Sequence, residues 1–193
     1  MILAIAILVL TALWRIVTVR IPELGNFSPV MALAFCAGVY TRNRWLWVAP
    51  FAALVLSDLY IDHWYAVTYR YDWTLQGETI RILCFAAALG IGLAVSRRKN
   101  WAGIVGGTLG ASLLFYLVTN TASWAGDMAY SHDFAGWVQA MTVGHPQFAS
   151  TISFYKNTLA SDLSFVAVFA LGMEYQARRR GQPSLLGLKQ VGG

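Results

Sequence analysis

The chain has 193 residues, of which 58% are hydrophobic and 12% are charged, whereas about 25% of residues are charged in typical soluble domains. With a mean hydropathy of +0.55, this composition indicates an integral membrane protein and excludes an ordinary soluble domain. The formal net charge of +5 does not indicate nucleic-acid binding, because the basic residues form no continuous stripe and gather in separate loops.

Six hydrophobic segments are predicted, at residues 2–19, 30–40, 45–61, 79–96, 102–119 and 154–173. We expect an all-α bundle of six transmembrane helices in one domain, residues 1–177, followed by a basic, flexible tail, residues 178–193. The first segment is expected to be a retained helix rather than a cleaved signal peptide, since it has neither a basic start nor a clear cleavage site. The second is too short to cross about 30 Å of hydrocarbon unaided, so it must either borrow residues from its flanks or be partly shielded by protein.

Basic residues gather in alternate connections between these segments. Nine of the fourteen lie between segments two and three, between four and five, or after segment six: Arg42, Arg44, Arg97, Arg98, Lys99, Arg178, Arg179, Arg180 and Lys189. If all six segments cross, these connections share one side, which the positive-inside rule makes cytoplasmic. Both termini are then cytoplasmic, and every acidic residue except Glu174 lies on or near the external side.

The first external loop carries Asn26 and Ser28 just before the second segment. Either side chain could cap that helix, with Pro29 in its first turn, or contribute to a binding site. Arg15, near the outer end of the first segment, either snorkels to the interface or meets an anionic group in a cavity.

The third segment ends in the acidic and aromatic stretch Leu56–Trp64. Asp58 and Asp62 are four residues apart and share a helical face if the helix continues that far. An external loop is expected to follow. It holds five aromatic residues within ten positions, which form either an interfacial belt or a lid that stacks on a ligand: Trp64, Tyr65, Tyr69, Tyr71 and Trp73.

The fourth segment begins near Arg81, and Cys84 lies one turn further along nearly the same face. Cys84 is either a small buried side chain or a soft ligand for a metal-bearing substrate, whereas Cys36 is expected to pack in the core. Both thiols lie inside apolar runs, so no disulfide framework is expected.

The fifth segment contains two overlapping G-x-x-x-G patterns, formed by Gly103, Gly106, Gly107 and Gly110. Such patterns allow close contact between helices, either inside the bundle or with a membrane partner. At the outer end of this segment, Asn120 and Trp124 share a face if the helix continues.

The connection between segments five and six includes an apolar stretch, residues 134–143, which predicts an interfacial helix ending before Gly144. Segment six then places Asp162 about two turns into its apolar run, on the same face as Thr158. An acid at this depth must be paired, protonated or exposed to water. Lys156 and Arg81 are the candidate partners.

Polar residues at the membrane edge all fall at the predicted external side: Asn26, Ser28, Asp58, Arg81, Cys84, Asn120, Asn157 and Asp162. A polar cavity on one side suits the capture of a small molecule from outside, with Trp64 and Trp124 covering it. A continuous pore would need polar residues through the full depth of the membrane.

Two other classes of function stay open. The glycine face of segment five could make the chain a structural subunit of a larger membrane complex. Paired acids could also perform acid–base catalysis. However, the sequence contains no H-E-x-x-H, G-x-S-x-G or Walker motif and no paired metal ligands, so an enzyme is not our main expectation.

Four short motifs carry a resemblance to a known family: N-F-S-P at residues 26–29, L-S-D-L at 56–59, L-V-T-N at 117–120 and N-T-L-A-S-D at 157–162. Together they resemble a bacterial family of small transport proteins of unknown function, over residues 20–173. That family is similar to the S-components of energy-coupling-factor vitamin transporters. The resemblance implies six helices in the bacterial cytoplasmic (inner) membrane and a substrate held between external loops and outer helix ends.

Segment one lacks the A-x-x-x-A pattern by which many S-components dock a shared transmembrane partner, which favours a solitary component. No ATP-binding motif occurs, so uptake would need either a separate ATPase or a passive, trapping mechanism. Among S-component-like proteins, a solitary cobalamin-binding type uses a cysteine in its site. The resemblance therefore implies cobalamin as the substrate and Cys84 as a ligand to its cobalt, a soft donor beneath a flat corrin that aromatic rings could cover.

Overall fold

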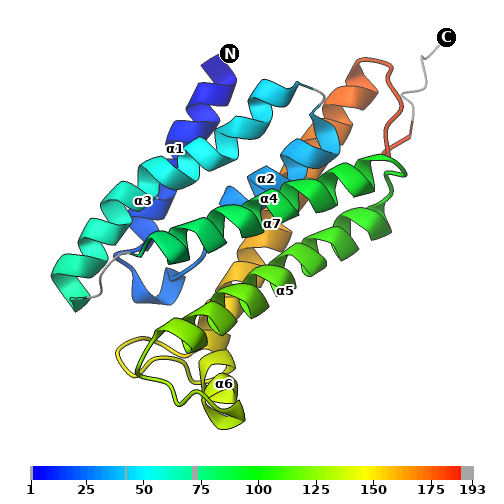
Figure 1. The fold of residues 1–193 in the computed structure, drawn as a ribbon. Coiled ribbons are helices and arrows are strands. Elements are labelled where there is room, and N and C mark those ends of the chain that lie inside the picture. The colour runs from blue at the N-terminus through cyan, green and yellow to red at the C-terminus, as the bar shows by residue number, and fades with distance from the viewer. Residues whose placement is uncertain (1, 42, 71–73, 188–193) are drawn as a thin grey trace.

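The computed structural model describes residues 2–41, 43–70 and 74–187, and this part of the chain forms helices and no strand (Figure 1). Arg42, Tyr71, Trp73 and Lys189 lie outside the described residues. The helices are α1 (Ile2–Thr18), α2 (Val30–Tyr40), α3 (Val48–Tyr69), α4 (Leu75–Ser96), α5 (Trp101–Gly126), α6 (Phe134–Met141) and α7 (Thr151–Arg179), with short 3-10 helices at Pro22–Leu24 and Arg44–Trp47.

Four of these helices are long and apolar enough to cross a membrane: α3 with the 3-10 turn before it, α4, α5 and α7. This indicates a helical membrane protein. The apolar helices α1 and α2 are shorter, with 17 and 11 residues. Of the six predicted transmembrane segments, the two that form α1 and α2 are therefore shorter than the other four.

Helix α2 lies at the centre of the bundle, where it packs against α3, α4, α5 and α7, while α1 packs against α3 (Figure 1). Eight of its residues are buried: Val30, Met31, Ala32, Ala34, Phe35, Cys36, Gly38 and Val39. A helix that is apolar on all sides belongs in such a buried position. The predicted shielding of this short helix by protein is confirmed.

The tightest helix contact joins α2 and α4. A Cβ atom on Gly38 would lie 2.3 Å from the Leu89 carbonyl oxygen, and one on Gly92 would lie 2.2 Å from the Phe35 carbonyl oxygen. Only glycine permits this approach of the two backbones. In the predicted glycine face of α5, by contrast, Cβ atoms on Gly106 and Gly110 would meet no described atom within 4 Å.

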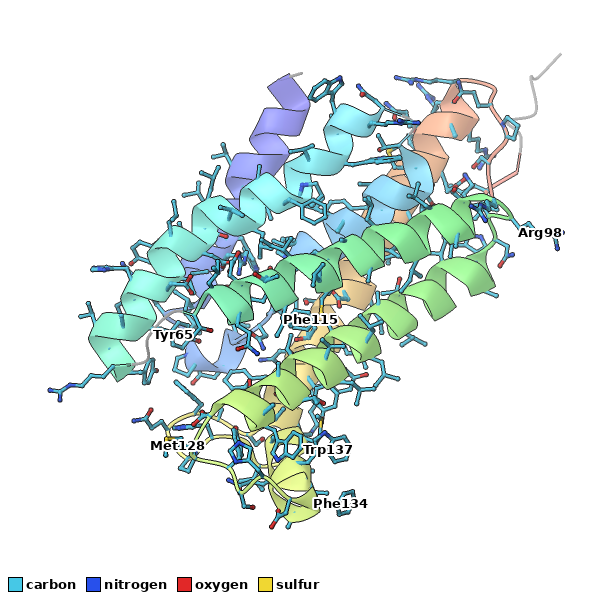
Figure 2. All side chains as sticks on the ribbon, in the orientation of Figure 1. Tyr65, Arg98, Phe115, Met128, Phe134 and Trp137 are labelled. Carbon is cyan, nitrogen blue, oxygen red and sulfur yellow. The ribbon has the colours of Figure 1, made fainter. Side chains whose placement is uncertain are left out.

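The start of α1 and the end of α7 lie at one end of the bundle (Figure 1), together with the α2–α3 and α4–α5 connections. Figure 2 places Arg98 at this end and Met128, Phe134 and Trp137 at the opposite end. We call these the basic end and the α6 end. The basic connections therefore share one end, as the charge pattern predicts.

Helix α3 continues well past the predicted boundary at residue 61 and stops at Tyr69, where Arg70 adopts a left-handed conformation with φ 53°. Trp64, Tyr65 and Tyr69 are therefore helical, and the prediction of a loop from Trp64 onward is wrong. The prediction ended the helix where the apolar run ended, but polar and aromatic residues can continue a helix beyond hydrocarbon, because each costs at most about 0.7 kcal/mol of helix propensity relative to alanine.

A helix, α6, lies where the apolar stretch at residues 134–143 predicts one, and it ends at Met141; its place at a membrane interface stays a prediction. Asp133 caps it, since Oδ1 accepts hydrogen bonds from the Gly136 N–H at 2.8 Å and the Ser131 hydroxyl at 2.9 Å. These bonds, that from Gly136 above all, lower the pKa of this exposed carboxyl. The exposed Phe134 ring stacks on Trp137, a pair suited to a membrane interface.

Candidate functional site

A cavity of about 860 Å³ lies between the helices at the α6 end, within the range of about 300–1,000 Å³ for small-molecule pockets. Its lining extends from rim residues Arg70 and His145 to Phe85 and Asp162, which lie within the helices. The cavity therefore reaches from the loops of the α6 end into the bundle.

Asp162 lies at the floor of this cavity and is 1% exposed. Its Oδ2 accepts a hydrogen bond from the Ser112 hydroxyl of α5, whereas its Oδ1 has no hydrogen-bond partner among the described residues. The predicted pairing with Lys156 or Arg81 is wrong. Lys156 is exposed, and three other carboxylates surround Arg81.

An arginine from α1 holds the other buried aspartate. Arg15 Nη2 lies 2.7 Å from Asp58 Oδ1, and Arg15 Nη1 donates to the Leu54 carbonyl at 3.1 Å and to the Ser57 hydroxyl. Asp58 is 3% exposed. These bonds fasten α1 to α3 and pair the two opposite charges, as a buried ion pair requires, although Asp58 Oδ2 accepts no hydrogen bond among the described residues. Of the two interpretations of Arg15, snorkelling to the interface and contact with an anionic group in a cavity, the contact with an anionic group is confirmed.

Arg81 of α4 faces the same aspartate from the other side. Its Nη2 lies 2.5 Å from Glu78 Oε2, 3.4 Å from Asp62 Oδ1 and 3.9 Å from Asp58 Oδ2. Asp58 and Asp62 thus share one face of α3, as their spacing predicts. In this cluster two guanidinium groups meet three carboxylates.

Aromatic side chains form much of the inner wall. The Phe85 and Phe115 rings lie 5.9 Å apart between centroids, and the Tyr116 and Tyr155 rings 4.3 Å apart. Figure 2 shows Phe115 between α4 and α5. The Tyr116 hydroxyl donates to the Met141 carbonyl, which connects this wall to α6.

A second aromatic group closes part of the rim. The Phe148 ring lies 6.0 Å from the Tyr65 ring, 5.2 Å from Tyr69 and 5.4 Å from His145. Tyr65 lies near the C-terminal end of α3 (Figure 2). These contacts join the end of α3 to the loop after α6, so aromatic residues do cover part of the cavity.

No characterised protein and no solved structure matches this chain. The model of one family, described as a family of unknown function (DUF6580), matches residues 1–185. The chain belongs to this family. The family description supplies no residue roles, so the site of this DUF6580 member is read from its geometry.

Five of the ten predicted site residues line the cavity: Asn26, Ser28, Arg81, Asn120 and Asp162. The other five lie outside its lining: Asp58, Trp64, Cys84, Trp124 and Asn157. Asn157 donates to the carbonyls of Glu23 and Gly25 at 2.8 and 2.9 Å, and so positions the loop that carries Asn26 and Ser28.

Trp64 and Trp124, the two tryptophans predicted to cover the cavity, make other contacts in this DUF6580 protein. Arg20 lies over the Trp64 ring at 5.4 Å from its centroid. Trp124 Nε1 donates to the Ser131 carbonyl at 2.9 Å, which fastens the loop after α5. Cys84 is 2% exposed and does not belong to the lining. Whether each of these side chains lines the cavity depends on how its helix is rotated about its axis. Spacing in the sequence does not reveal that rotation.

Several lining residues were not predicted, among them Phe115, Tyr116 and Tyr155. Aromatic side chains in apolar segments look the same in sequence whether they face lipid, core or a cavity. Arg15 did carry a signal, because an arginine inside an apolar segment needs a partner. Among the described residues, no three His, Cys, Asp or Glu side chains are placed to hold a metal ion.

Proposed function

We propose that this membrane protein captures a small molecule in the cavity at the α6 end, on the external side of a bacterial cytoplasmic membrane, as a step in uptake. The cavity carries the proposal, since it combines a polar floor with aromatic walls and is lined by five predicted site residues. The basic residues at the opposite end support the orientation through the positive-inside rule.

A six-helix arrangement like that of an S-component accommodates the two short helices. The 17 residues of α1 reach the lower limit of about 17–25 residues for crossing a bilayer, and four neighbouring helices surround α2. Near the basic end, the close backbone contact of α2 and α4 supports capture on one side over an open pore.

A structural role has one observation in its favour. Gly106 and Gly110 are exposed on α5 with open space around them, which suits a partner helix in the membrane. Such a partner could equally belong to a separate ATPase module. Catalysis by an Asp58–Asp162 pair gains no such support, because Arg15 binds Asp58 and that carboxylate does not line the cavity.

Cobalamin is the narrower prediction that the resemblance implies. In this conformation Cys84 is buried outside the lining, so a bond to cobalt would require α4 to turn. The absorption spectrum of the purified protein with added cobalamin tests this directly. A shift in wild type that disappears in Cys84→Ala would support cobalamin; no shift would remove it and leave capture of another molecule intact.

Capture itself is tested with two alanines of α5. Ala122 lines the cavity, whereas Ala125, nearly one turn further, is exposed and lies outside the lining. Wild type, Ala122→Trp and Ala125→Trp would be purified identically, and their bound small molecules extracted and identified by mass spectrometry. We expect one molecule enriched in wild type and Ala125→Trp and depleted in Ala122→Trp, because the indole occupies the cavity.

Matched melting temperatures would show that both tryptophan variants fold. Equal contents in all three proteins, or no retained molecule in any of them, would contradict capture at this cavity.

A further inference from the structure

The charges around the cavity are unevenly matched. In the inner cluster, Arg15 and Arg81 face three carboxylates, those of Asp58, Asp62 and Glu78. Neither guanidinium is left to attract an anionic ligand, because each already lies within 2.7 Å of a carboxylate oxygen.

At the rim, the charges are open to other partners. Arg70 is exposed, so water solvates it. Asp127 Oδ2 lies 3.8 Å from His145 Nε2. Neither rim group therefore leaves an isolated buried charge.

Asp162 differs from all of these. It is 1% exposed, its one bond is from the neutral Ser112 hydroxyl, and its Oδ1 has no partner among the described residues. An ionised carboxylate removed from water is strongly unfavourable unless a positive charge or several hydrogen bonds compensate it. The residues around it supply neither, although it lines a cavity large enough for a ligand.

The aromatic walls of the cavity suit a positively charged ligand, as the Asp162 carboxylate does. Phe85, Phe115, Tyr116 and Tyr155 all line the cavity. The faces of aromatic rings attract cations, and the attraction strengthens when water is excluded. The rings also offer apolar area to an organic framework attached to the charge.

We propose that the captured molecule is an organic cation whose positively charged nitrogen binds the Asp162 carboxylate at the cavity floor, while the aromatic walls hold its apolar part. This inference rests on the proposed capture function and defines its substrate class. A charge-assisted bond to the carboxylate compensates the charge that the protein leaves unpaired.

The competing explanation is a permanently neutral carboxyl that only bonds Ser112. Asparagine reproduces the shape and hydrogen bonding of that neutral form but cannot carry a negative charge. Asp162→Asn therefore preserves binding under the competing explanation and abolishes cation selectivity under ours.

The test uses three probes with the same ring and different charge: phenethylamine, 2-phenylethanol and phenylacetate. Calorimetric titration of the full-length purified protein at neutral pH, to millimolar concentrations, measures each affinity. We expect phenethylamine to bind wild type at least about tenfold more tightly than the alcohol, since a hydrogen bond between two charged groups is stronger than one to a neutral hydroxyl. Phenylacetate should bind weakest.

In Asp162→Asn the preference for the amine over the alcohol should vanish. Asp133→Asn is the matched control, because it removes an acid outside the lining and asparagine still caps a helix; it should keep the preference. Asp162→Glu retains the charge and should also keep it. If Asp162→Asn does not fold, the order of the three probes on wild type still decides.

Preferential binding of the alcohol or phenylacetate, or an unchanged preference in Asp162→Asn, would overturn the cation inference and leave capture standing. If none of the probes binds, the molecule retained by wild type decides. A retained cation supports the inference, a retained neutral or anionic molecule overturns it, and the absence of any retained molecule overturns capture as well.

Discussion

Two buried carboxylates on one helix divide the molecule into two regions. Glu174, near the basic end of α7, is 0% exposed. Lys99 Nζ lies 2.6 Å from its Oε1, and the Leu185 N–H donates to its Oε2 at 2.7 Å. Asp162 lies twelve residues earlier, about 18 Å away along the helix, and among the described residues its carboxylate is bonded only by the Ser112 hydroxyl.

The same contrast holds for packing. At the basic end, Gly38 and Gly92 bring the backbones of α2 and α4 into contact. At the α6 end, the helices separate around a cavity of about 860 Å³. Burial of an acid is therefore no sign of a binding site by itself. The informative feature is a buried acid without a partner beside open space.

The largest expected effect comes from disrupting the α2–α4 backbone contact near the basic end. Gly92→Leu would force a side chain into the Phe35 carbonyl, so its cost should exceed the about 1–3 kcal/mol typical of overpacked cores. We expect a fall in melting temperature of about 10 °C or more, measured in detergent by tryptophan fluorescence. Gly106→Leu, on the open face of α5, should change it little. Equal losses in both variants would contradict the assigned α2–α4 contact.

A smaller loss of stability should follow from removing the cation that pairs with Glu174. Lys99→Met leaves Glu174 buried without its cation, which costs about 3–5 kcal/mol in fully buried pairs; because Lys99 is partly exposed, we expect about 2 kcal/mol. Thermal unfolding measures the loss. The double variant Lys99→Met/Glu174→Gln should recover part of it. Additive losses from the two single changes would show that the pair is not coupled.

The smallest effect should come from Asp162 itself. In the ligand-free protein, Asp162→Asn removes an uncompensated charge and keeps an oxygen for Ser112, so stability should be unchanged or rise by about 1 kcal/mol. Glu174→Gln, the matched change near the basic end, should destabilise the protein. The two melting temperatures give the comparison. A fall in Asp162→Asn as large as that in Glu174→Gln would mean that Asp162 has a structural partner.

Much of the fold followed from local patterns. The short helix at residues 30–40 has the predicted bounds, and α6 begins at the predicted residue, Phe134. Helix ends were less predictable where α3 and α5 continue past their apolar runs. Hydropathy reports the extent of hydrocarbon contact, whereas helical hydrogen bonding continues until a residue such as Arg70 ends it.

For the candidate site, the sequence by itself determined which polar residues occur near the helix ends and that Asp162 lies deep in an apolar run. It also determined that basic residues gather in alternate connections. These properties depend on composition and on spacing along one helix. Each can be read without knowing any neighbour.

Only the tertiary structure decided which of these residues meet. It joined Arg15 to Asp58 across 43 positions, buried Cys84 outside the cavity lining, and placed the glycines that bring two helix backbones together on α2 and α4 rather than on the open face of α5. Among the described residues it also placed no basic side chain against Asp162, although an acid at that depth must be paired, protonated or exposed to water. Such outcomes depend on how each helix rotates and packs against segments distant in sequence, and a single helical pattern carries no information about them.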